Sequence, residues 1–327
     1  MDPEFLYASD ADHDGTGRRS LARKCRNGEL VRVRAGVYIR AAQWQKMPKW
    51  DRDRAAISAA VDQGQGHAPR ILIQQSAAVI WGLPVIGRTS EVLLLAPGSS
   101  HGRRRGNLCW TPRTLLEPTT TQDGLTLTSR AQTVLDMAAR LPFERAVPAM
   151  DHMLRPDEAR GFPALERDAL MVLSGKLPDE AKRTRARRVI SFADGRSESP
   201  GESYSRAVLH LLGFPQPELQ HEFRSAGGEF LGRTDFYWKE YALVGEFDGA
   251  VKYGAIGSSN TSGTSQQIGT AVRETLIREK RREDAIRATG VGFVRWSWSD
   301  ITKPKHDPDG LVRMLLRAGL PRKRRRA

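Results

Sequence analysis

The most regular alternation of apolar and basic residues lies near the start of the chain, in VRVRAGVYIR at residues 31–40. Valine and arginine alternate up to an Ala-Gly pair, and a second apolar run follows it and ends at Arg40. Because neighbouring residues of a strand point to opposite faces, the pattern predicts a hairpin with one apolar and one basic face. The segment GRRSLARKCRNGEL before it predicts a short helix that Ser20 caps and Gly28 ends.

A basic helix followed by a basic hairpin is what a winged helix-turn-helix requires, with the helix in the major groove and the wing on phosphates or in the minor groove. A surface helix and hairpin that merely carry solvated charge remain the alternative, because the acidic, glycine-containing residues before Gly17 make a poor first helix. The loop HGRRRGN at 101–107 is either a phosphate contact or a solvated turn. The candidate nucleic-acid contacts are Arg18, Arg19, Lys24, Arg26, Arg32, Arg34, Arg40, Arg103, Arg104 and Arg105.

Changes in composition divide the chain into several parts. The middle of the chain mixes helical segments such as SRAQTVLDMAARL with a strand-like run, SEVLLLAP, and has no catalytic grouping of side chains. The opening Met-Asp-Pro-Glu-Phe has the character of a vector remnant. The expected divisions are a flexible N-terminus at 1–16, a winged-helix-like unit at 17–45, a mixed α/β middle domain at 50–175, a basic linker at 176–199, a C-terminal domain at 200–320 and a basic tail at 321–327.

The C-terminal domain has the apolar pattern of an α+β core. It predicts a helix, three strands, a second helix and a fourth strand, at 201–213, 219–225, 229–238, 241–248, 272–289 and 291–298. The polar segment AIGSSNTSGTSQQIG before the second helix is either a lid over a site or a tolerated surface insertion. The whole chain is therefore expected to be a multidomain α+β protein within the broad α/β class.

Carboxylates accompany these C-terminal elements at Glu202 in the first helix, Asp235 in the second strand, and Glu246 and Asp248 in the third. Glu246 and Asp248 are two residues apart and so share one face of their strand. A carboxylate in a mostly apolar strand is costly unless it is paired or binds a cation, and carboxylate oxygens suit Mg²⁺ or Mn²⁺. Ion pairing with arginine or lysine is the alternative for each acid taken singly.

Composition favours a polyanionic partner. The 327 residues include 52 lysines and arginines against 38 aspartates and glutamates, a net charge of +14, and nucleic acid is the commonest partner of such a protein. Cys25 and Cys109 are isolated, which indicates a reducing, cytoplasmic compartment and no zinc site. An acidic membrane surface or an acidic protein are the alternative partners. No apolar run is long enough to span a membrane and no basic amphipathic helix with an aromatic face argues for a membrane surface, so no membrane partner is expected.

Residues 201–300 resemble the PD-(D/E)xK nuclease superfamily, especially its branch similar to very-short-patch repair endonucleases. The resemblance is carried by Glu202, Asp235, the EFDG at 246–249, the basic helix REKRREDAIRATG and the strand VGFVRWSW. It implies a restriction-endonuclease-like αβββαβ core that cuts DNA with Mg²⁺. The sequence departs from the motif where Asp248 takes the place of its lysine, and Lys252 is the best candidate for a displaced lysine.

Residues 17–155 resemble the AbiEi-like antitoxin family of bacteria. The resemblance is carried by RNGELVRVRAGVYIR, QSAAVIWGLP and GLTLTSRAQTVLDMAAR. It implies an N-terminal winged helix, a role in DNA binding and transcriptional regulation, and a setting of genome defence with a cognate toxin or defence partner.

Together these patterns predict a metal-dependent DNA endonuclease with a DNA-binding N-terminal region. Asp235 and Glu246 would hold Mg²⁺ or Mn²⁺ with help from Asp248, while Glu202 would ligate a second ion or orient a water. Lys252 would stabilise the transition state or position the water. Arg282 and Arg295 are expected to be phosphate contacts or structural pairs. A non-catalytic DNA-binding regulator with a degenerate nuclease fold, and an RNA-acting nuclease, are the alternatives.

Overall fold

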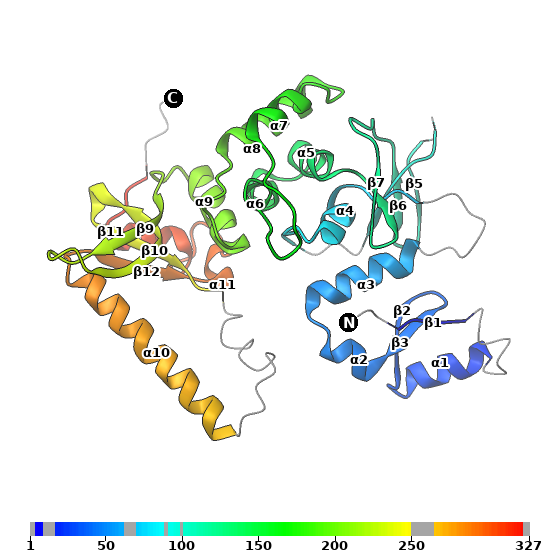
Figure 1. The fold of residues 1–327 in the computed structure, drawn as a ribbon, viewed down its shortest axis with the longest axis horizontal. Coiled ribbons are helices and arrows are strands. Elements are labelled where there is room, and N and C mark those ends of the chain that lie inside the picture. Colours follow the sequence, from blue (N-terminus) through cyan, green and yellow to red (C-terminus); the bar gives the residue numbers. More distant parts are fainter. Residues whose placement is uncertain are drawn as a thin grey trace. The chain divides into compact units, whose positions relative to one another are not determined.

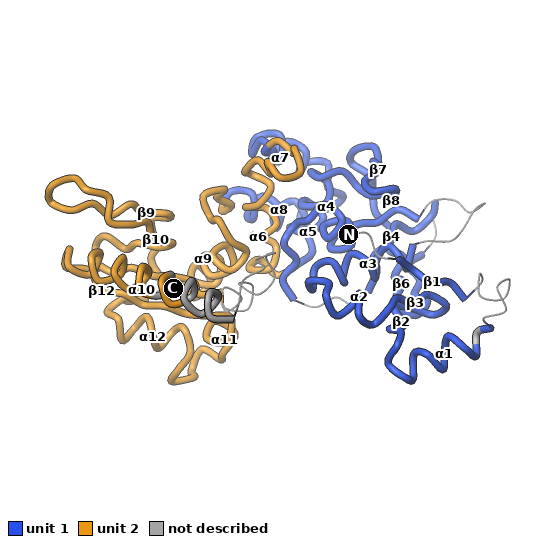
Figure 2. The backbone as a smooth tube through the Cα atoms, turned by 60° about the horizontal axis from the view of Figure 1, so that its bottom comes forward, with its two compact units in different colours: residues 1–141, 164–191 blue, residues 142–163, 192–327 orange. Residues whose placement is uncertain are grey.

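The chain folds into two compact units, which are described separately (Figure 2). In this computed structural model the described residues are 4–8, 17–61, 70–87, 91–98, 101–249 and 265–322. Unit 1 comprises residues 1–141 and 164–191, and unit 2 comprises residues 142–163 and 192–327. Helices and small sheets occur in both units, so the predicted α+β character is confirmed.

Unit 1 begins with a small antiparallel sheet and one basic helix (Figure 1). The elements are β1 (Leu6–Tyr7), α1 (Arg18–Arg26), β2 (Leu30–Arg34) and β3 (Val37–Arg40), with sheet order β1-β3-β2. Leu21, Leu30 and Tyr38 form its core. The helix and hairpin therefore lie where the alternation predicts them, because their apolar positions meet on one side.

Two details of this region differ from the sequence-based expectations. The N-cap of α1 is Gly17, with no side-chain cap, so Ser20 lies inside the first turn and does not cap the helix. The segment 1–16 was expected to lie outside the fold, yet Leu6 and Tyr7 pair with Tyr38 and Val37 of β3. A short strand adds to an available sheet edge through backbone hydrogen bonds, which no side-chain periodicity over two residues can reveal.

The rest of unit 1 consists of helices around short strands. Its elements are α2 (Ala41–Lys46), α3 (Lys49–Val61), α4 (Gln74–Trp81), β4 (Val92–Leu95), β5 (Arg103–Arg105), β6 (Leu108–Thr111), β7 (Thr120–Gln122), β8 (Leu125–Leu127), α5 (Arg130–Arg140), α7 (Arg167–Ser174) and α8 (Glu180–Phe192). Strands β4, β6 and β5 form a sheet in that order, and β7 and β8 form a hairpin. The fully buried Leu72, Leu94, Leu127 and Leu135 belong to its core.

The division of the chain does not follow the expected boundaries. Residues 176–199, expected to be a linker, contain α8, whose Ala186, Val189 and Ile190 are buried. Helix α6 (Phe143–Met153), expected in the middle domain, belongs to unit 2 and packs against α9 (Pro200–Leu212). Apolar periodicity marks a helix face but does not name the helix on which that face packs.

Unit 2 is built on a four-stranded sheet, β9 (Glu218–Arg224), β10 (Phe230–Trp238), β11 (Leu243–Phe247) and β12 (Gly292–Trp296). The order is β12-β11-β10-β9, with β9, β10 and β11 antiparallel and β12 parallel to β11. The remaining elements are the 3₁₀ turn at Lys239–Tyr241, α10 (Ser265–Arg287), α11 (Trp298–Ile301) and α12 (Leu311–Arg317).

Apolar side chains cover both faces of this sheet. One face carries Trp238, Leu243, Phe247 and Trp296, which pack with Leu209, Leu212 and Leu315 of α9 and α12. Gly245 lies on this face, where an added Cβ would come within 2.7 Å of the Trp296 ring, so the close approach of the two tryptophans requires glycine. The other face carries Phe223 and Val244, which pack with Ile286 of α10 and with Val291.

No helix among the described residues is long and apolar enough to cross a membrane.

Candidate functional site

Asp235 and Glu246 meet on the α10 face of the unit 2 sheet. Phe236 pairs with Gly245 in antiparallel register, so the preceding Asp235 lies opposite the following Glu246. Side chains directly opposite on neighbouring strands have Cβ atoms about 5 Å apart. The Asp235 Oδ2 accepts a hydrogen bond of 2.9 Å from the Phe247 amide, which fixes the carboxylate at the end of β11. Two carboxylates at this separation repel each other and need positive charge nearby.

Two arginines supply that positive charge. Glu246 Oε1 accepts a hydrogen bond of 2.7 Å from an Arg282 guanidinium nitrogen, and Glu246 Oε2 lies 2.8 Å from Arg295. Arg282 and Arg295 also reach Glu279 and Glu283 of α10, at 3.0 and 2.9 Å respectively. Burial lowers the pKa of Arg282, but the hydrogen bond and charge of Glu246 outweigh it, and the pKa is raised overall. The two arginines were expected to be phosphate contacts or structural pairs, and the described contacts show them paired with carboxylates.

Asp248 directly follows β11, with its amide bonded to the Trp296 carbonyl at 2.8 Å. Among the described residues no hydrogen-bond donor or cation partners its carboxylate. Its carboxylate oxygens are therefore available as acceptors at the C-terminal end of β11, two residues after Glu246. Lys252, expected to reach back to this site, lies outside the described residues, as do residues 255–264 of the polar segment.

Glu202 approaches the same end of β11 from α9. Ser199 caps α9 by accepting a hydrogen bond from the Glu202 amide at 3.2 Å. The preceding Gly201 touches the Phe247 ring and leaves no room for a side chain. The Glu202 carboxylate is buried, and its Oε2 accepts hydrogen bonds of 2.8 Å from the Glu198 amide and from Gln220 Nε2. Two donors already satisfy this oxygen, which favours a positioning role over a direct metal ligand.

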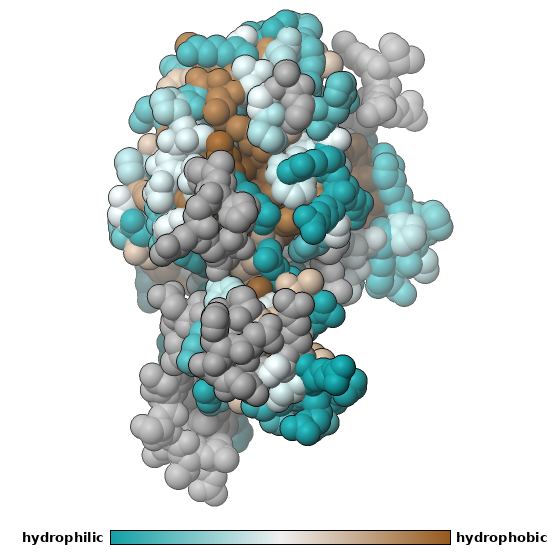
Figure 3. All heavy atoms as spheres, turned by 90° about the vertical axis from the view of Figure 1, so that its right-hand side faces the viewer, coloured by the Kyte–Doolittle hydropathy of each residue, from teal (hydrophilic) through white to brown (hydrophobic). Residues whose placement is uncertain are grey.

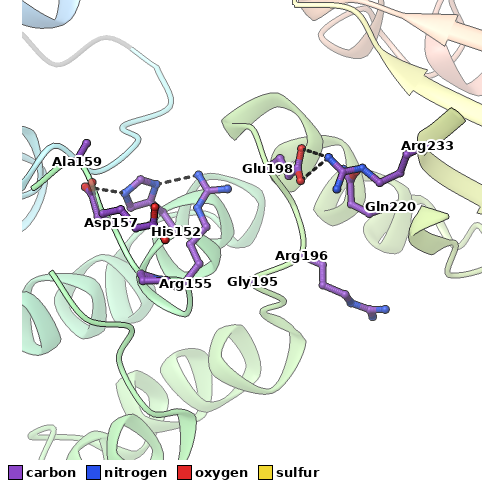
Figure 4. Close-up of a pocket in the computed structure, with 11 residues that line it drawn as sticks. His152, Arg155, Asp157, Ala159, Gly195, Arg196, Glu198, Gln220 and Arg233 are labelled. Atoms are coloured by element: carbon purple, nitrogen blue, oxygen red, sulfur yellow. Dashed lines mark hydrogen bonds and ion pairs between the residues drawn. The ribbon is translucent and has the colours of Figure 1, made fainter. Parts of the chain in front are cut away.

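A pocket of about 620 Å³ opens beside Glu202 and is lined by Gln220, the residue that donates to it (Figure 4). Arg155 lies 3.1 Å from His152 Nδ1, and His152 Nε2 lies 3.7 Å from Asp157. Since a guanidinium can only donate, Nδ1 is the acceptor and His152 is the neutral Nε2–H tautomer. Arg233 and Arg196 also line this pocket, and both are paired with carboxylates, Glu198 and Asp194 respectively. No ligand spacing in the sequence marks His152 as a pocket residue.

The donor set fits a hard divalent cation in chemistry, because Asp235, Glu246 and Asp248 all offer carboxylate oxygens. Their arrangement is a different matter. Within the described residues no three His, Cys, Asp or Glu side chains are grouped so that they could hold a metal ion. Glu246 is a suitable type of metal ligand, but the guanidinium groups of Arg282 and Arg295 occupy both of its oxygens, where a cation would bind.

The predicted nucleic-acid contacts fall on two parts of unit 1. On α1 and the hairpin, Arg19, Arg26, Arg32 and Arg40 are exposed and Lys24 is half-buried, while the side chain of Arg18 lies outside the described residues. Arg34 is half-buried and donates to the Ala60 carbonyl at 2.7 Å, so it caps the end of α3. Arg103, Arg104 and Arg105 are exposed on β5.

No family model matches the chain. The chain is similar to two uncharacterized proteins of Mycobacterium tuberculosis, MT2308 of strain CDC 1551 / Oshkosh and Rv2248 of strain ATCC 25618 / H37Rv. Each is 29% identical over 271 residues, which is 81% of this chain and 92% of the relative. The similarity therefore runs through most of both chains, and the names of the relatives state no activity.

Among solved structures, the chain is similar to the crystal structure of the RV2827C protein from Mycobacterium tuberculosis. The TM-score is 0.33 at 15% identity, over 68% of this chain and 84% of that chain. A similarity this low supports no conclusion about the fold or the activity.

Proposed function

We propose that the protein is a metal-dependent DNA endonuclease of the PD-(D/E)xK type, acting through the carboxylates of unit 2. The observation that carries the proposal is the placement of Asp235 opposite Glu246 on neighbouring strands, with Asp248 just beyond the C-terminal end of β11. The order helix, three strands, helix and strand around them is the order that the nuclease resemblance implies.

Asp235, Glu246 and Asp248 would hold Mg²⁺ or Mn²⁺ once Glu246 exchanged its arginine partners for the cation, and the ion would supply a lower pKa for a coordinated water and charge neutralisation at the phosphate. Asp235 is oriented by the Phe247 amide, and Glu202 orients Gln220 and the backbone at Glu198. Arg282 and Arg295 balance the charge of Glu246 through their ion pairs with it. Lys252 is proposed as the cation that contacts the scissile phosphate.

The test compares plasmid cleavage by the parent with Asp235→Asn and Glu246→Gln, in Mg²⁺ or Mn²⁺ and in EDTA. Each change keeps the side-chain shape but removes a negative ligand, so cleavage should fall at least about 100-fold. Glu222→Gln, an exposed acid on β9, is the matched control and should cut like the parent. Equal cleavage by the parent and both site variants would show that the activity lies elsewhere.

A second function, a DNA-binding regulator whose nuclease-like unit does not cut, is favoured by the arginine pairs on Glu246. If the parent cuts neither DNA nor RNA with either metal, this function replaces the first. Cleavage of RNA in preference to DNA under the same conditions would instead assign an RNA-acting nuclease.

The resemblance of residues 17–155 to AbiEi-like antitoxins supports a DNA-binding winged-helix role for α1, β2 and β3, in a cytoplasmic defence setting with a cognate toxin or other defence partner. Charge reversal at exposed Arg19, Arg26 and Arg32 should weaken DNA binding if this hairpin and helix touch DNA.

A further inference from the structure

A second group of arginines in unit 1 centres on β5 and also includes Arg34 of the predicted winged helix. Strand β5 lies at the edge of the sheet order β4-β6-β5. In its antiparallel register with β6, Arg103 pairs with Trp110, Arg104 with Cys109, and Arg105 with Leu108. Because strand residues alternate between faces, Arg103 and Arg105 share one face and Arg104 lies on the other.

Arg104 has an acidic partner, whereas Arg103 and Arg105 face other cations. Arg104 lies 2.9 Å from Glu91. Within the described part of the chain, no carboxylate pairs with Arg103 or Arg105. The right-hand side of Figure 1, where β5 and β6 are labelled, faces the viewer in Figure 3, which shows hydrophilic residues on both sides of a hydrophobic strip.

Trp110 joins this face of β5 to another part of the unit. The Arg103 guanidinium carbon lies 4.3 Å from the Trp110 ring centroid, and that of Arg70 lies 5.7 Å from it. Both distances lie within the range of a cation–π interaction, which holds the guanidinium groups near the ring although they repel each other. Arg70 donates to the Ala60 carbonyl at 2.7 Å, and Arg34 donates to the same oxygen at the same distance.

The electrostatics of Arg70 indicate that the cluster is strongly positive. Burial lowers the pKa of Arg70 first, and the charges of Arg34, Arg103 and Arg105 lower it further. The contacts to Trp110 and to Ala60 therefore hold positively charged arginines close together against their electrostatic repulsion. An anion bound between them would remove this repulsion.

We propose that Arg103 and Arg105 of β5, together with Arg70 beside Trp110 and Arg34 at the Ala60 carbonyl that Arg70 shares, form a contact surface for the phosphate backbone of DNA. Trp110 is 7% exposed and its ring is engaged by guanidinium groups, so it is not open for a base to stack on. Without an aromatic platform, the surface contacts phosphates and does not distinguish base sequences. The inference takes DNA as partner from the proposed function, but it requires no cleavage.

DNA is favoured over an acidic protein segment because the whole chain carries a net charge of +14 and the cluster is fixed rather than adaptable. A regular row of phosphates meets several fixed guanidinium groups at once, and each such contact releases counterions.

The test uses the full-length protein with the double substitution R103Q/R105Q, which leaves Arg34, Arg70 and Trp110 in place. The matched control is R313Q/R317Q, two exposed arginines of α12 in unit 2. Binding to two mixed-sequence duplexes of equal length is measured by fluorescence anisotropy in EDTA, at several salt concentrations between about 50 and 200 mM. Circular dichroism melts check that both variants remain folded.

We expect the slope of log affinity against log salt to become shallower by about 1.8 for R103Q/R105Q, since each phosphate contact contributes about 0.9. The loss should be equal on the two duplexes, and the control should keep the parent slope. An unchanged slope in a folded R103Q/R105Q variant would overturn the proposal. Loss of binding to a poly-glutamate peptide with unchanged DNA binding would also overturn it and assign an acidic protein partner.

Failure of this proposal and failure of the nuclease proposal are distinguishable. A shallower slope in EDTA with no cleavage by the parent in Mg²⁺ would keep the backbone contact and remove the nuclease. Cleavage that depends on Asp235, together with an unchanged slope of log affinity against log salt, would keep the nuclease and remove the backbone contact.

Discussion

Unit 2 pairs carboxylates with arginine in two places, and the two pairs differ in how open they are. Asp151 of α6 and Arg206 of α9 are 1% and 5% exposed, and Arg206 also donates to the Phe192 carbonyl while Asp151 accepts from the Asp194 amide. Glu246 is 12% exposed, and its partner Arg295 is 37% exposed. The first pair is closed to solvent on all sides, whereas the second lies at a surface with other acids within reach.

The difference separates a structural pair from one that can exchange partners. A buried ion cannot lose its counter-ion without leaving an unsolvated charge, so the Asp151–Arg206 pair ties α6 permanently to α9. Arg295 is a third exposed and already lies 2.9 Å from Glu283, so it keeps a carboxylate partner if it leaves Glu246. The Glu246 site therefore has the openness that a functional site needs.

The largest expected effect comes from separating α6 from its partner. A fragment of residues 195–327 lacks Asp151 and exposes the α9 face that α6 covers, whereas a fragment of residues 142–327 keeps both. The shorter fragment should be unfolded or aggregated and the longer one should melt cooperatively, as followed by circular dichroism. A shorter fragment that melts cooperatively would show that unit 2 does not need α6.

Removing one charge of the closed pair should have the next largest effect. Asp151→Asn leaves Arg206 buried without an anion and should lower the free energy of unfolding by about 3–5 kcal/mol. Urea denaturation measures the change. Glu222→Gln, in an exposed pair with Arg224, is the matched control and should change it by about 1 kcal/mol or less. Equal changes in the free energy of unfolding for the two variants would show that the buried pair contributes no more to stability than the exposed pair.

The open pair should respond in metal affinity rather than in stability. Arg295→Gln releases one oxygen of Glu246 and should raise Mn²⁺ affinity about tenfold, which corresponds to about 1.4 kcal/mol of removed competition. Isothermal titration calorimetry measures it, and Arg313→Gln is the control for loss of one surface charge. No change in affinity would mean that Arg295 does not compete with a cation for Glu246.

The smallest effect concerns the pocket side of α6, one residue after Asp151. Burial lowers the pKa of His152, and the charges of Arg155 and Arg160 lower it further, against the opposing effect of Asp157. The unfolded chain then binds a proton more readily than the folded protein. The stability from His152 is present above its ordinary pKa of about 6.5 and is lost as the pH falls through the folded pKa.

Melting temperatures of the parent should therefore fall between pH 7 and pH 5, and His152→Gln should fall less. The same measurement on a variant of exposed His306 controls for loss of any histidine. Parallel curves for the parent and His152→Gln would show that protonation at this pocket does not oppose folding.

Sequence patterns located the elements better than they located the contacts between them. The alternation in VRVRAGVYIR predicted β2 and β3, and the apolar runs around Asp235 and Glu246 predicted β10 and β11. The segment 176–199 was expected to be a linker because basic residues dominate it, although three apolar residues of α8 within it are buried. The wing arginines were expected to act alike, but Arg34 turns inward to Ala60, a partner 26 residues away.

The sequence by itself determined which residues share a strand or helix face, because backbone geometry imposes periods of two and 3.6 residues on any chain. It thereby put Glu246 and Asp248 on one side of their strand. Residues 101–107 were expected to be a loop, and only the structure shows that Arg103 and Arg105 lie on one side of strand β5. Only the tertiary structure decided which charges meet: Glu246 with Arg282 and Arg295, Asp151 with Arg206, and Arg70 with Arg103 around Trp110. Coulomb energy depends on distance in space and on burial, and neither quantity is written in the local order of residues.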